Sequence, residues 1–189
     1  MSILTTTHKT FIEIEFIEDI CIKNAIEKAI EELYGKVDDD FISFDMQRGI
    51  EIEPLAFNYF SDVMDLKFIK VTNCGFFDNC EHSGASPDGL VGEDSILEIK
   101  CPKASTFFKL VATNDIDPKY YYQMQMQMIA TKRNKGYFFN YIIIDGIEYS
   151  HTIEVLKNDI TCKKISERIL EGVEIKKEYI NKINKNKQF

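Results

Sequence analysis

The segment at residues 86–103 constrains the fold of this chain most, because charged residues interrupt what is otherwise a buried strand. The segment begins with SPDGL and ends with LEIKCPK. Two short strands joined by a turn at 92–95 account for this pattern, with Ile96, Leu97 and Ile99 as an apolar run. Such a run is typical of the centre of a sheet, so the segment predicts a hairpin in the core.

Glu98 and Lys100 share one face of the second strand, because residues two apart in a strand point the same way. If the two strands pair, Asp88 falls near Glu98. Carboxylate oxygens favour hard cations such as Mg²⁺ and Mn²⁺, which activate water and neutralise charge on a phosphate. Lys100 could orient or deprotonate that water, since burial and a nearby cation lower a lysine pKa. A bare E-x-K is more often an outward ion pair, but the preceding Pro-Asp-Gly favours a site here.

A helix is expected at about residues 46–65, where Glu53 lies near the edge of the apolar stripe. The stripe would include Leu55 and Val63. Pro54 could mark the start of this helix, which would place Glu53 at its N-cap. The alternative interpretation is a first-turn or solvent-exposed glutamate without a role.

A second helix is expected at about residues 118–133, since Met and Gln are good helix formers. On that helix Gln123 and Gln127 share one face, while Gln125 lies roughly opposite. The alternative is a stripe of methionines in the core with glutamines at its margin.

Four short motifs in this chain resemble those of the phage lambda exonuclease branch of the PD-(D/E)XK nucleases, the YqaJ-type viral recombinases. They follow in the order of that family with comparable spacing and lie within roughly half of the chain. They are G-x-x-x-E-x-x-A at 49–56, SPDGL at 86–90, LEIKCP at 97–102 and Q-x-Q at 123–125.

This resemblance implies an α/β fold, an α+β mixed sheet flanked by helices with a PD-(D/E)XK restriction-endonuclease-like core. We expect a single nuclease domain over residues 1–189. Its motif core would lie at about 48–141, and a C-terminal helix at about 158–185.

The resemblance further implies a metal-dependent exonuclease that degrades one strand of double-stranded DNA 5′ to 3′ and leaves a 3′ overhang for single-strand annealing. Two ions of Mg²⁺, or alternatively Mn²⁺, would serve each site. The expected partners are double-stranded DNA ends, an annealing protein and further copies of the chain in a ring trimer, without a membrane. A phage or prophage protein in the bacterial cytoplasm is expected. A PD-(D/E)XK endonuclease of another branch and an inactive DNA-binding module are the alternatives.

The same resemblance assigns roles to individual residues. Lys100 and Gln123 would handle the attacking water, while three carboxylates and the main-chain carbonyl of Ile99 would hold the metal ions. Ser86 and Lys103 would bind the 5′-phosphate or the DNA, with a turn-forming serine as the alternative for Ser86. The arginine segment with which relatives grip the 5′-phosphate has no match before residue 45. The carboxylates are those of Asp88, Glu98 and Glu53, the last of these matching the motif in place of Glu51.

Composition limits the function less than these motifs do. The net charge of −8 is unusual for a protein that contacts phosphates, but clusters such as 38–40 hold much of it, so charge neither supports nor excludes DNA. Five cysteines without paired spacing favour reduced thiols. Cys74, Cys80 and His82 fit no common zinc motif, and a surface position is the expectation for His82 over a role as catalytic base.

The rest of the chain predicts further elements of both kinds. No segment has the length and apolarity of a membrane span, and the first residues do not resemble a signal peptide. The expected elements are a strand at 11–17, a helix at 20–34 ended by Gly35, short strands within 67–77, a polar loop at 78–82, a helix at 104–112, a hairpin of 137–144 and 147–153 about Asp145-Gly146, and a long helix from 158.

Overall fold

The computed structural model describes residues 22–35 and 43–186 of the chain. Contacts divide the chain into two compact units, one formed by Phe41–Cys162 and the other by Met1–Asp40 with Lys163–Phe189. The assignment of one domain to the whole chain stays a prediction.

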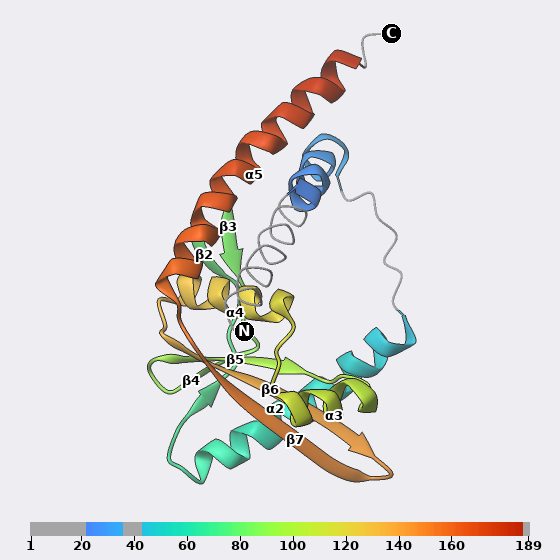
Figure 1. The fold of residues 1–189 in the computed structure, drawn as a ribbon, viewed down its shortest axis with the longest axis vertical. Helices are drawn as coiled ribbons and strands as arrows, with labels where there is room; N and C mark the ends of the chain where they lie inside the picture. Colours follow the sequence, from blue (N-terminus) through green and yellow to red (C-terminus); the bar gives the residue numbers. More distant parts are fainter. Residues whose placement is uncertain (1–21, 36–42, 187–189) are drawn as a thin grey trace, which may run out of the picture. The chain divides into compact units, whose positions relative to one another are not determined.

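A five-stranded mixed sheet forms the centre of the unit Phe41–Cys162 (Figure 1). The strands lie in the order β1-β4-β5-β6-β7. β5 and β6 are parallel, and the other neighbouring pairs are antiparallel. The predicted α/β fold with a mixed sheet flanked by helices is therefore confirmed. The strands are β1 (Val71–Thr72), β4 (Gly89–Val91), β5 (Ser95–Lys100), β6 (Lys135–Ile144) and β7 (Ile147–Leu156).

Helices cover both faces of this sheet, because its central strands are apolar on both sides. α2 (Phe44–Asp65) packs on the face that includes Leu97. α3 (Ala104–Thr113) and α4 (Pro118–Thr131) pack on the opposite face, which includes Ile96. Neighbouring residues of β5 thus belong to two different core clusters, as expected for a strand at the centre of a sheet.

The end of α4 is attached to the turn of the central β4–β5 hairpin. Arg133 Nη1 donates hydrogen bonds to the carbonyls of Gly92 and Ser95, at 2.9 and 2.8 Å. Because Arg133 comes directly after Lys132, the C-cap residue of α4, these bonds help to hold α4 beside β5, the strand that carries Glu98.

Helix α2 begins earlier than one sequence interpretation placed it. Ser43 is its N-cap, and the Ser43 hydroxyl accepts a hydrogen bond from the Met46 N–H. Pro54 lies inside the helix, so the prediction that the helix starts at Pro54 with Glu53 as N-cap is wrong. Leu55 is also exposed, as is Val63, although the stripe was predicted to bury both.

A small hairpin replaces the polar loop expected at 78–82. β2 (Phe77–Cys80) pairs antiparallel with β3 (Ser83–Ala85), with a register shift near Asp78. The polar side chains of this segment suggested a loop. They are polar because most of β2 is exposed and no residue of the hairpin is fully buried. An exposed two-stranded ribbon therefore leaves little apolar pattern to detect.

The β6–β7 hairpin and the helices at both ends agree with the sequence prediction. Asp145 and Gly146 both have positive φ, at 51° and 77°, as a two-residue type I′ turn requires. Residues 22–34 are helical and end at Gly35, which has a φ of 77°. The strand expected at 11–17 lies outside the described residues.

Helix α5 (Asp159–Asn186) confirms the long C-terminal helix. Its residues from Lys163 onward belong to the same unit as the helix at 22–34. Lys176 of α5 pairs there with Glu32, at 2.6 Å. None of the helices in the described part of the chain is both long and apolar enough to cross a bilayer.

Candidate active site

Asp88 and Glu98 are brought together by the register of the central hairpin. Gly89 pairs with Leu97, and the main-chain N–H of Asp88 donates to the Leu97 carbonyl at 3.0 Å. Continuing this antiparallel register by one residue places Asp88 opposite Glu98. The predicted proximity of these two carboxylates is therefore confirmed.

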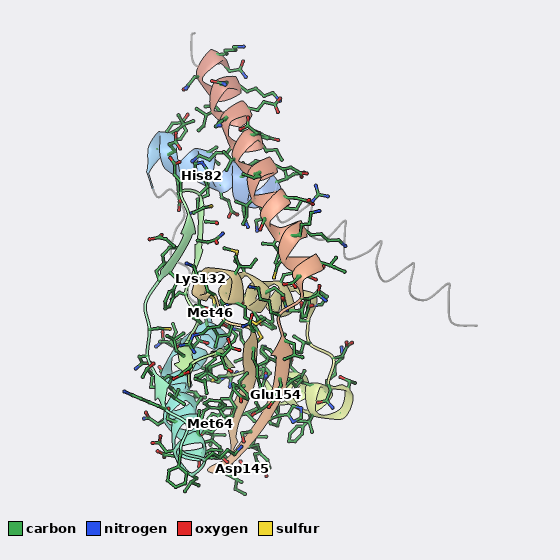
Figure 2. All side chains as sticks on the ribbon, turned by 90° about the vertical axis from the view of Figure 1, so that its left-hand side faces the viewer. Met46, Met64, His82, Lys132, Asp145 and Glu154 are labelled. Carbon is green, nitrogen blue, oxygen red and sulfur yellow. The ribbon has the colours of Figure 1, made fainter. Side chains whose placement is uncertain are left out.

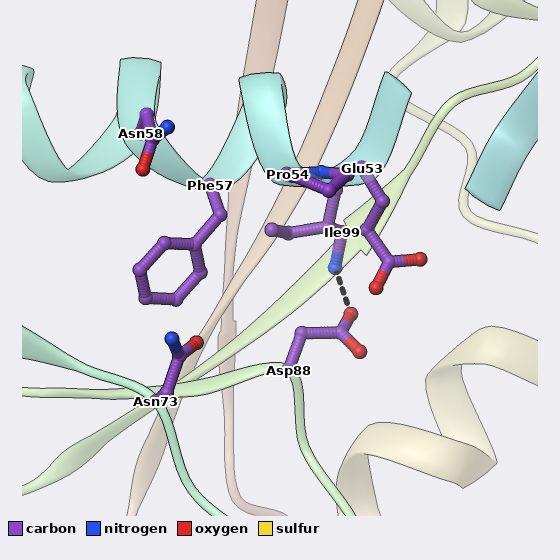
Figure 3. A pocket seen from close by; sticks show the side chains of 7 residues that line it. All are labelled: Glu53, Pro54, Phe57, Asn58, Asn73, Asp88 and Ile99. Carbon is purple, nitrogen blue, oxygen red and sulfur yellow. Dashed lines mark hydrogen bonds between the residues drawn. The ribbon is translucent and has the colours of Figure 1, made fainter. Parts of the chain in front are cut away.

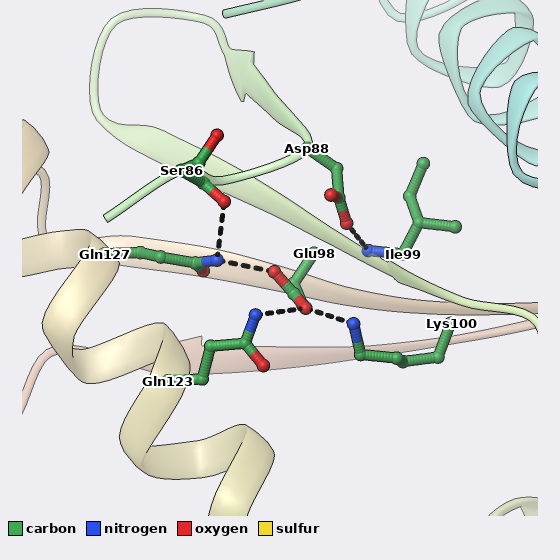
Figure 4. A network of polar contacts seen from close by, with 7 residues as sticks. All are labelled: Ser86, Asp88, Glu98, Ile99, Lys100, Gln123 and Gln127. Atoms are coloured by element: carbon green, nitrogen blue, oxygen red, sulfur yellow. Dashed lines mark hydrogen bonds and ion pairs between the residues drawn. The ribbon is translucent and has the colours of Figure 1, made fainter. Parts of the chain in front are cut away.

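The Glu98 side chain is fully buried and lies in a network of donors (Figure 4). Gln123 Nε2 donates to Glu98 Oε1 at 2.8 Å, and Lys100 Nζ donates to the same oxygen. Gln127 Nε2 donates to Glu98 Oε2 at 2.5 Å. A buried carboxylate needs such compensation, because an uncompensated charge in the interior is costly.

Lys100 lies on the same face of β5 as Glu98, as predicted, but its pKa does not shift downward. Burial lowers the pKa of the Lys100 ammonium, yet the charge and hydrogen bond of Glu98 outweigh burial and raise it on balance. The ammonium also lies 5.1 Å from the centre of the Tyr120 ring. Without a bound cation the pKa of Lys100 is therefore raised, and Lys100 donates a hydrogen bond to Glu98. The expectation that a nearby cation lowers this pKa stays a prediction.

The glutamines of α4 lie on two different faces of the helix, as predicted from the helical repeat. Gln123 and Gln127 meet Glu98, while Gln125 accepts a hydrogen bond from the Asn158 N–H and donates to the Leu156 carbonyl, at 2.8 and 2.9 Å. Gln127 was not among the predicted site residues. The signal for it was present, since i and i+4 residues of a helix are neighbours.

One buried acceptor of this network has no partner within the described residues. Gln127 is 1% exposed, and its Oε1 accepts no hydrogen bond. Its Nε2, by contrast, donates to both Glu98 and the Ser86 carbonyl, the latter at 3.4 Å. An unpaired buried carbonyl is unusual, so the amide of Gln127 has hydrogen-bonding capacity that the described residues do not use.

The pKa of Asp88 is raised from 3.8 to about 7. Burial is the largest cause, followed by the negative charge of Glu98, and the charge of Glu53 acts in the same direction. The Ile99 N–H and the Lys100 ammonium oppose these effects without cancelling them. Three carboxylates thus influence one another here, as expected where a site is built to receive positive charge.

Glu53 and Asp88 line one pocket of about 230 Å³, in which their carboxylates face each other (Figure 3). Glu53 extends from α2, and Asp88 immediately precedes β4. Five further residues line the pocket: Pro54, Phe57, Asn58, Asn73 and Ile99.

The donor chemistry of this region fits a hard divalent cation. Asp88, Glu53 and Glu98 offer carboxylate oxygens, and only one oxygen of Asp88 accepts a hydrogen bond from a described residue. No group of three or more His, Cys, Asp or Glu side chains lies close enough to hold a metal ion within the described ranges. Both carboxylate oxygens of Glu98 accept hydrogen bonds, from the side-chain amides of Gln123 and Gln127 and from Lys100. For Glu98 to bind a cation, one of these hydrogen bonds would have to be replaced by a bond to the ion.

The remaining predicted residues lie around this centre. The Ser86 carbonyl contacts Gln127, while the role of its exposed side chain stays a prediction. Lys103 is the N-cap residue of α3. His82 lies in the exposed turn of the β2–β3 hairpin (Figure 2) and is not among the residues that line the pocket.

Arg48 is a further residue near the site that sequence analysis did not single out. Its Nη2 donates to the Cys101 carbonyl at 2.9 Å, next to Lys100. This contact joins α2 to the end of β5 over 53 residues of chain. No local pattern could have predicted it, because it depends on how α2 packs on the sheet.

Comparison with known proteins identifies the family. The family model of the YqaJ-like viral recombinase domain matches residues 19–134, which is more than half of the chain. The chain belongs to the YqaJ-like viral recombinase domain family. This confirms the resemblance found in the four motifs. None of the curated proteins matches the sequence of the chain.

Solved structures agree with membership of the YqaJ-like family. The alkaline exonuclease LHK-Exo from Laribacter hongkongensis is 29% identical with a TM-score of 0.72, and the match covers 87% of this chain and 83% of that one. LHK-Exo in complex with dAMP matches with the same coverage at 27% identity and a TM-score of 0.71. A phage related exonuclease from Haemophilus somnus 129PT shares the fold, at 15% identity and a TM-score of 0.55, with 86% and 83% coverage.

Proposed function

We propose that this YqaJ-family protein is a metal-dependent exonuclease that degrades one strand of double-stranded DNA 5′ to 3′ and leaves a 3′ overhang. The observation that carries the proposal is the fully buried Glu98 carboxylate, which lies opposite Asp88 and shares its face of β5 with Lys100. Two related crystal structures are those of an alkaline exonuclease, and one of them contains dAMP. A buried, charged cluster beside an open pocket is typical of a catalytic centre.

Asp88, Glu98 and Glu53, with the carbonyl of Ile99, would hold Mg²⁺ or Mn²⁺. When bound, two such ions supply charge neutralisation at the scissile phosphate and lower the pKa of water. The raised pKa of Asp88 supports this assignment, because a positive charge would relieve the repulsion among the three carboxylates.

Lys100 would act on the reacting groups as an ammonium. Its pKa is raised by Glu98, so it carries a proton that can be donated in a hydrogen bond to a phosphate oxygen or to water. Gln123, which contacts the same oxygen of Glu98, would orient Glu98 and the attacking water. Ser86 and Lys103 would contact the 5′-phosphate or the adjacent DNA.

A cleavage assay on three substrates tests the proposal. Linear duplex with a 5′-phosphate, linear duplex with a 5′-hydroxyl and covalently closed circles are incubated with the protein and Mg²⁺. We expect degradation of linear duplex only, fastest with the 5′-phosphate, and retention of a label at the 3′ end until late in the reaction. Nicking of circles would instead identify an endonuclease, and no cleavage with either Mg²⁺ or Mn²⁺ would identify a binding module.

The biological setting of the activity follows from the same proposal. The 3′ overhang would be passed to a single-strand annealing protein, and copies of the chain would form a ring trimer around duplex DNA in the cytoplasm of a bacterial host. Sedimentation of the protein with and without duplex DNA tests the trimer directly.

A further inference from the structure

We propose that the pocket beside Asp88 binds the nucleobase of the terminal nucleotide, with Phe57 stacking on the base and Asn73 contacting its edge. The inference rests on the proposed function and extends it from the phosphate to the base. The pocket has two chemically different ends, which Figure 3 shows together: the carboxylates of Glu53 and Asp88 at one end, and the Phe57 ring with two amides at the other.

A nucleoside monophosphate has the same two ends. Its phosphate requires cations, which the carboxylates would hold, and its base is a flat ring edged by donors and acceptors. An aromatic side chain suits the face of any base, because every base can stack on it. An amide suits the edge, because it carries both donors and an acceptor.

The Phe57 ring is held in place by a close approach to the strand below it. A Cβ atom at Gly89 would lie 3.0 Å from Phe57 Cε2 and 3.3 Å from the Thr72 carbonyl oxygen. The absence of a side chain at Gly89 therefore lets the ring pack against the start of β4, one residue after Asp88. Phe57 is only partly buried, so part of its ring stays open to the pocket.

The two amides at this end of the pocket are not used by the fold. Asn58 and Asn73 are both exposed, and neither side chain makes a hydrogen bond to any described residue. The described buried amides of α4, by contrast, are hydrogen-bonded to Glu98 or to the main chain. Unpaired amides in a pocket wall can bond to a ligand without breaking a structural contact.

The size of the pocket suits a single nucleotide unit. Its volume of about 230 Å³ is below the range of roughly 300–1,000 Å³ that is typical for drug-sized ligands. One base with part of its sugar would fill it, and a second base would remain outside. This matches removal of one nucleotide at a time from a strand end.

Equilibrium binding of two probes tests the inference without DNA cleavage. dAMP and 2-deoxyribose 5-phosphate, which lacks the base, are titrated into the wild-type protein with Mg²⁺ by calorimetry. We expect dAMP to bind about five- to a hundredfold more tightly, the range that corresponds to one base–aromatic stack. Phe57→Leu keeps the apolar packing of Phe57 but removes the aromatic face, so it should bring the two affinities together. Asn73→Ala should narrow the difference less.

Phe68→Ala is the matched control, since Phe68 is 99% exposed and is not among the residues that line the pocket. It should preserve the preference for dAMP. Equal binding of both probes by the wild-type protein, no binding of dAMP, or an unchanged preference in Phe57→Leu would overturn the inference. Absence of DNA cleavage by the wild-type protein would instead overturn the proposed function, so the two failures are distinguishable.

Discussion

The Asp88 carboxylate accepts a hydrogen bond from the main-chain N–H of Ile99, at 2.6 Å (Figures 3 and 4). Ile99 lies between the two charged residues of β5, so this bond couples the position of one site carboxylate to the strand that carries the other. A shift of the hairpin by one residue would turn Glu98 to the opposite face of the sheet. The site and the register of the hairpin are therefore one structural feature, and variants of Asp88 report on both.

Asp88→Asn should stabilise the protein at alkaline pH in the absence of divalent cations. Between pH 3.8 and about 7, folded Asp88 keeps a proton that the unfolded chain has lost, so the free energy of unfolding falls as pH rises. The side-chain oxygen of asparagine can still accept the hydrogen bond from the Ile99 N–H, and asparagine carries no charge. We expect thermal denaturation in EDTA to show a Tm about 3–6 °C above wild type at pH 8, with no difference near pH 4.

The same experiment with Mg²⁺ separates the electrostatic cause from a simple packing effect. Cation binding should raise the Tm of the wild-type protein at pH 8 and should change that of Asp88→Asn much less. A Tm difference between the two proteins that is constant from pH 4 to pH 8 would contradict the raised pKa of Asp88.

Glu53→Gln should weaken metal-dependent cleavage, whereas Glu51→Gln should not. Glu53 faces Asp88 across the pocket, while the exposed Glu51 accepts a hydrogen bond from Gln47. We expect the Mg²⁺ concentration for half-maximal cleavage to rise at least about tenfold for Glu53→Gln. Even the loss of a residue that only hydrogen-bonds to a metal ligand typically lowers metal affinity about tenfold or more. Equal effects of the two substitutions would show that Glu53 is not a ligand.

Gln127→Met should destabilise the fold more than Gln123→Met. Gln127 is buried and is the only described residue that donates to Glu98 Oε2, so its loss leaves a buried carboxylate oxygen unpaired at a cost of about 2–3 kcal/mol. Gln123 is exposed, and water can replace its amide. The urea midpoint should fall accordingly with an unchanged m-value, and a larger shift for Gln123→Met would contradict this arrangement.

Lys100→Ala should abolish cleavage while the fold remains intact. Removal of a proton donor at the reacting groups typically lowers the rate about 10²–10⁴-fold, and circular dichroism would show whether the secondary structure persists. Lys109→Ala, at an exposed position of α3, is the matched control. Cleavage by Lys100→Ala at the wild-type rate would remove Lys100 from the site.

Much of the site could be predicted because strand and helix periodicities are local. The two-residue repeat of β5 placed Glu98 with Lys100, and the turn at 92–95 predicted the hairpin that brings Asp88 to Glu98. The helix expected at about 46–65 is confirmed by α2, whereas the alternative start at Pro54 is wrong, because the long helix continues through that proline. The β2–β3 hairpin escaped detection, because exposed strands show no apolar alternation.

The sequence alone determined which side chains share a face, because that depends only on the geometry of the residues next to each other in the chain. The tertiary structure decided which of them meet. It set Gln127 beside Glu98, Arg48 beside Cys101 and Phe57 over Gly89. It also decided that the pKa of Lys100 rises, because that direction depends on the balance of burial and charge summed over elements that are distant in sequence.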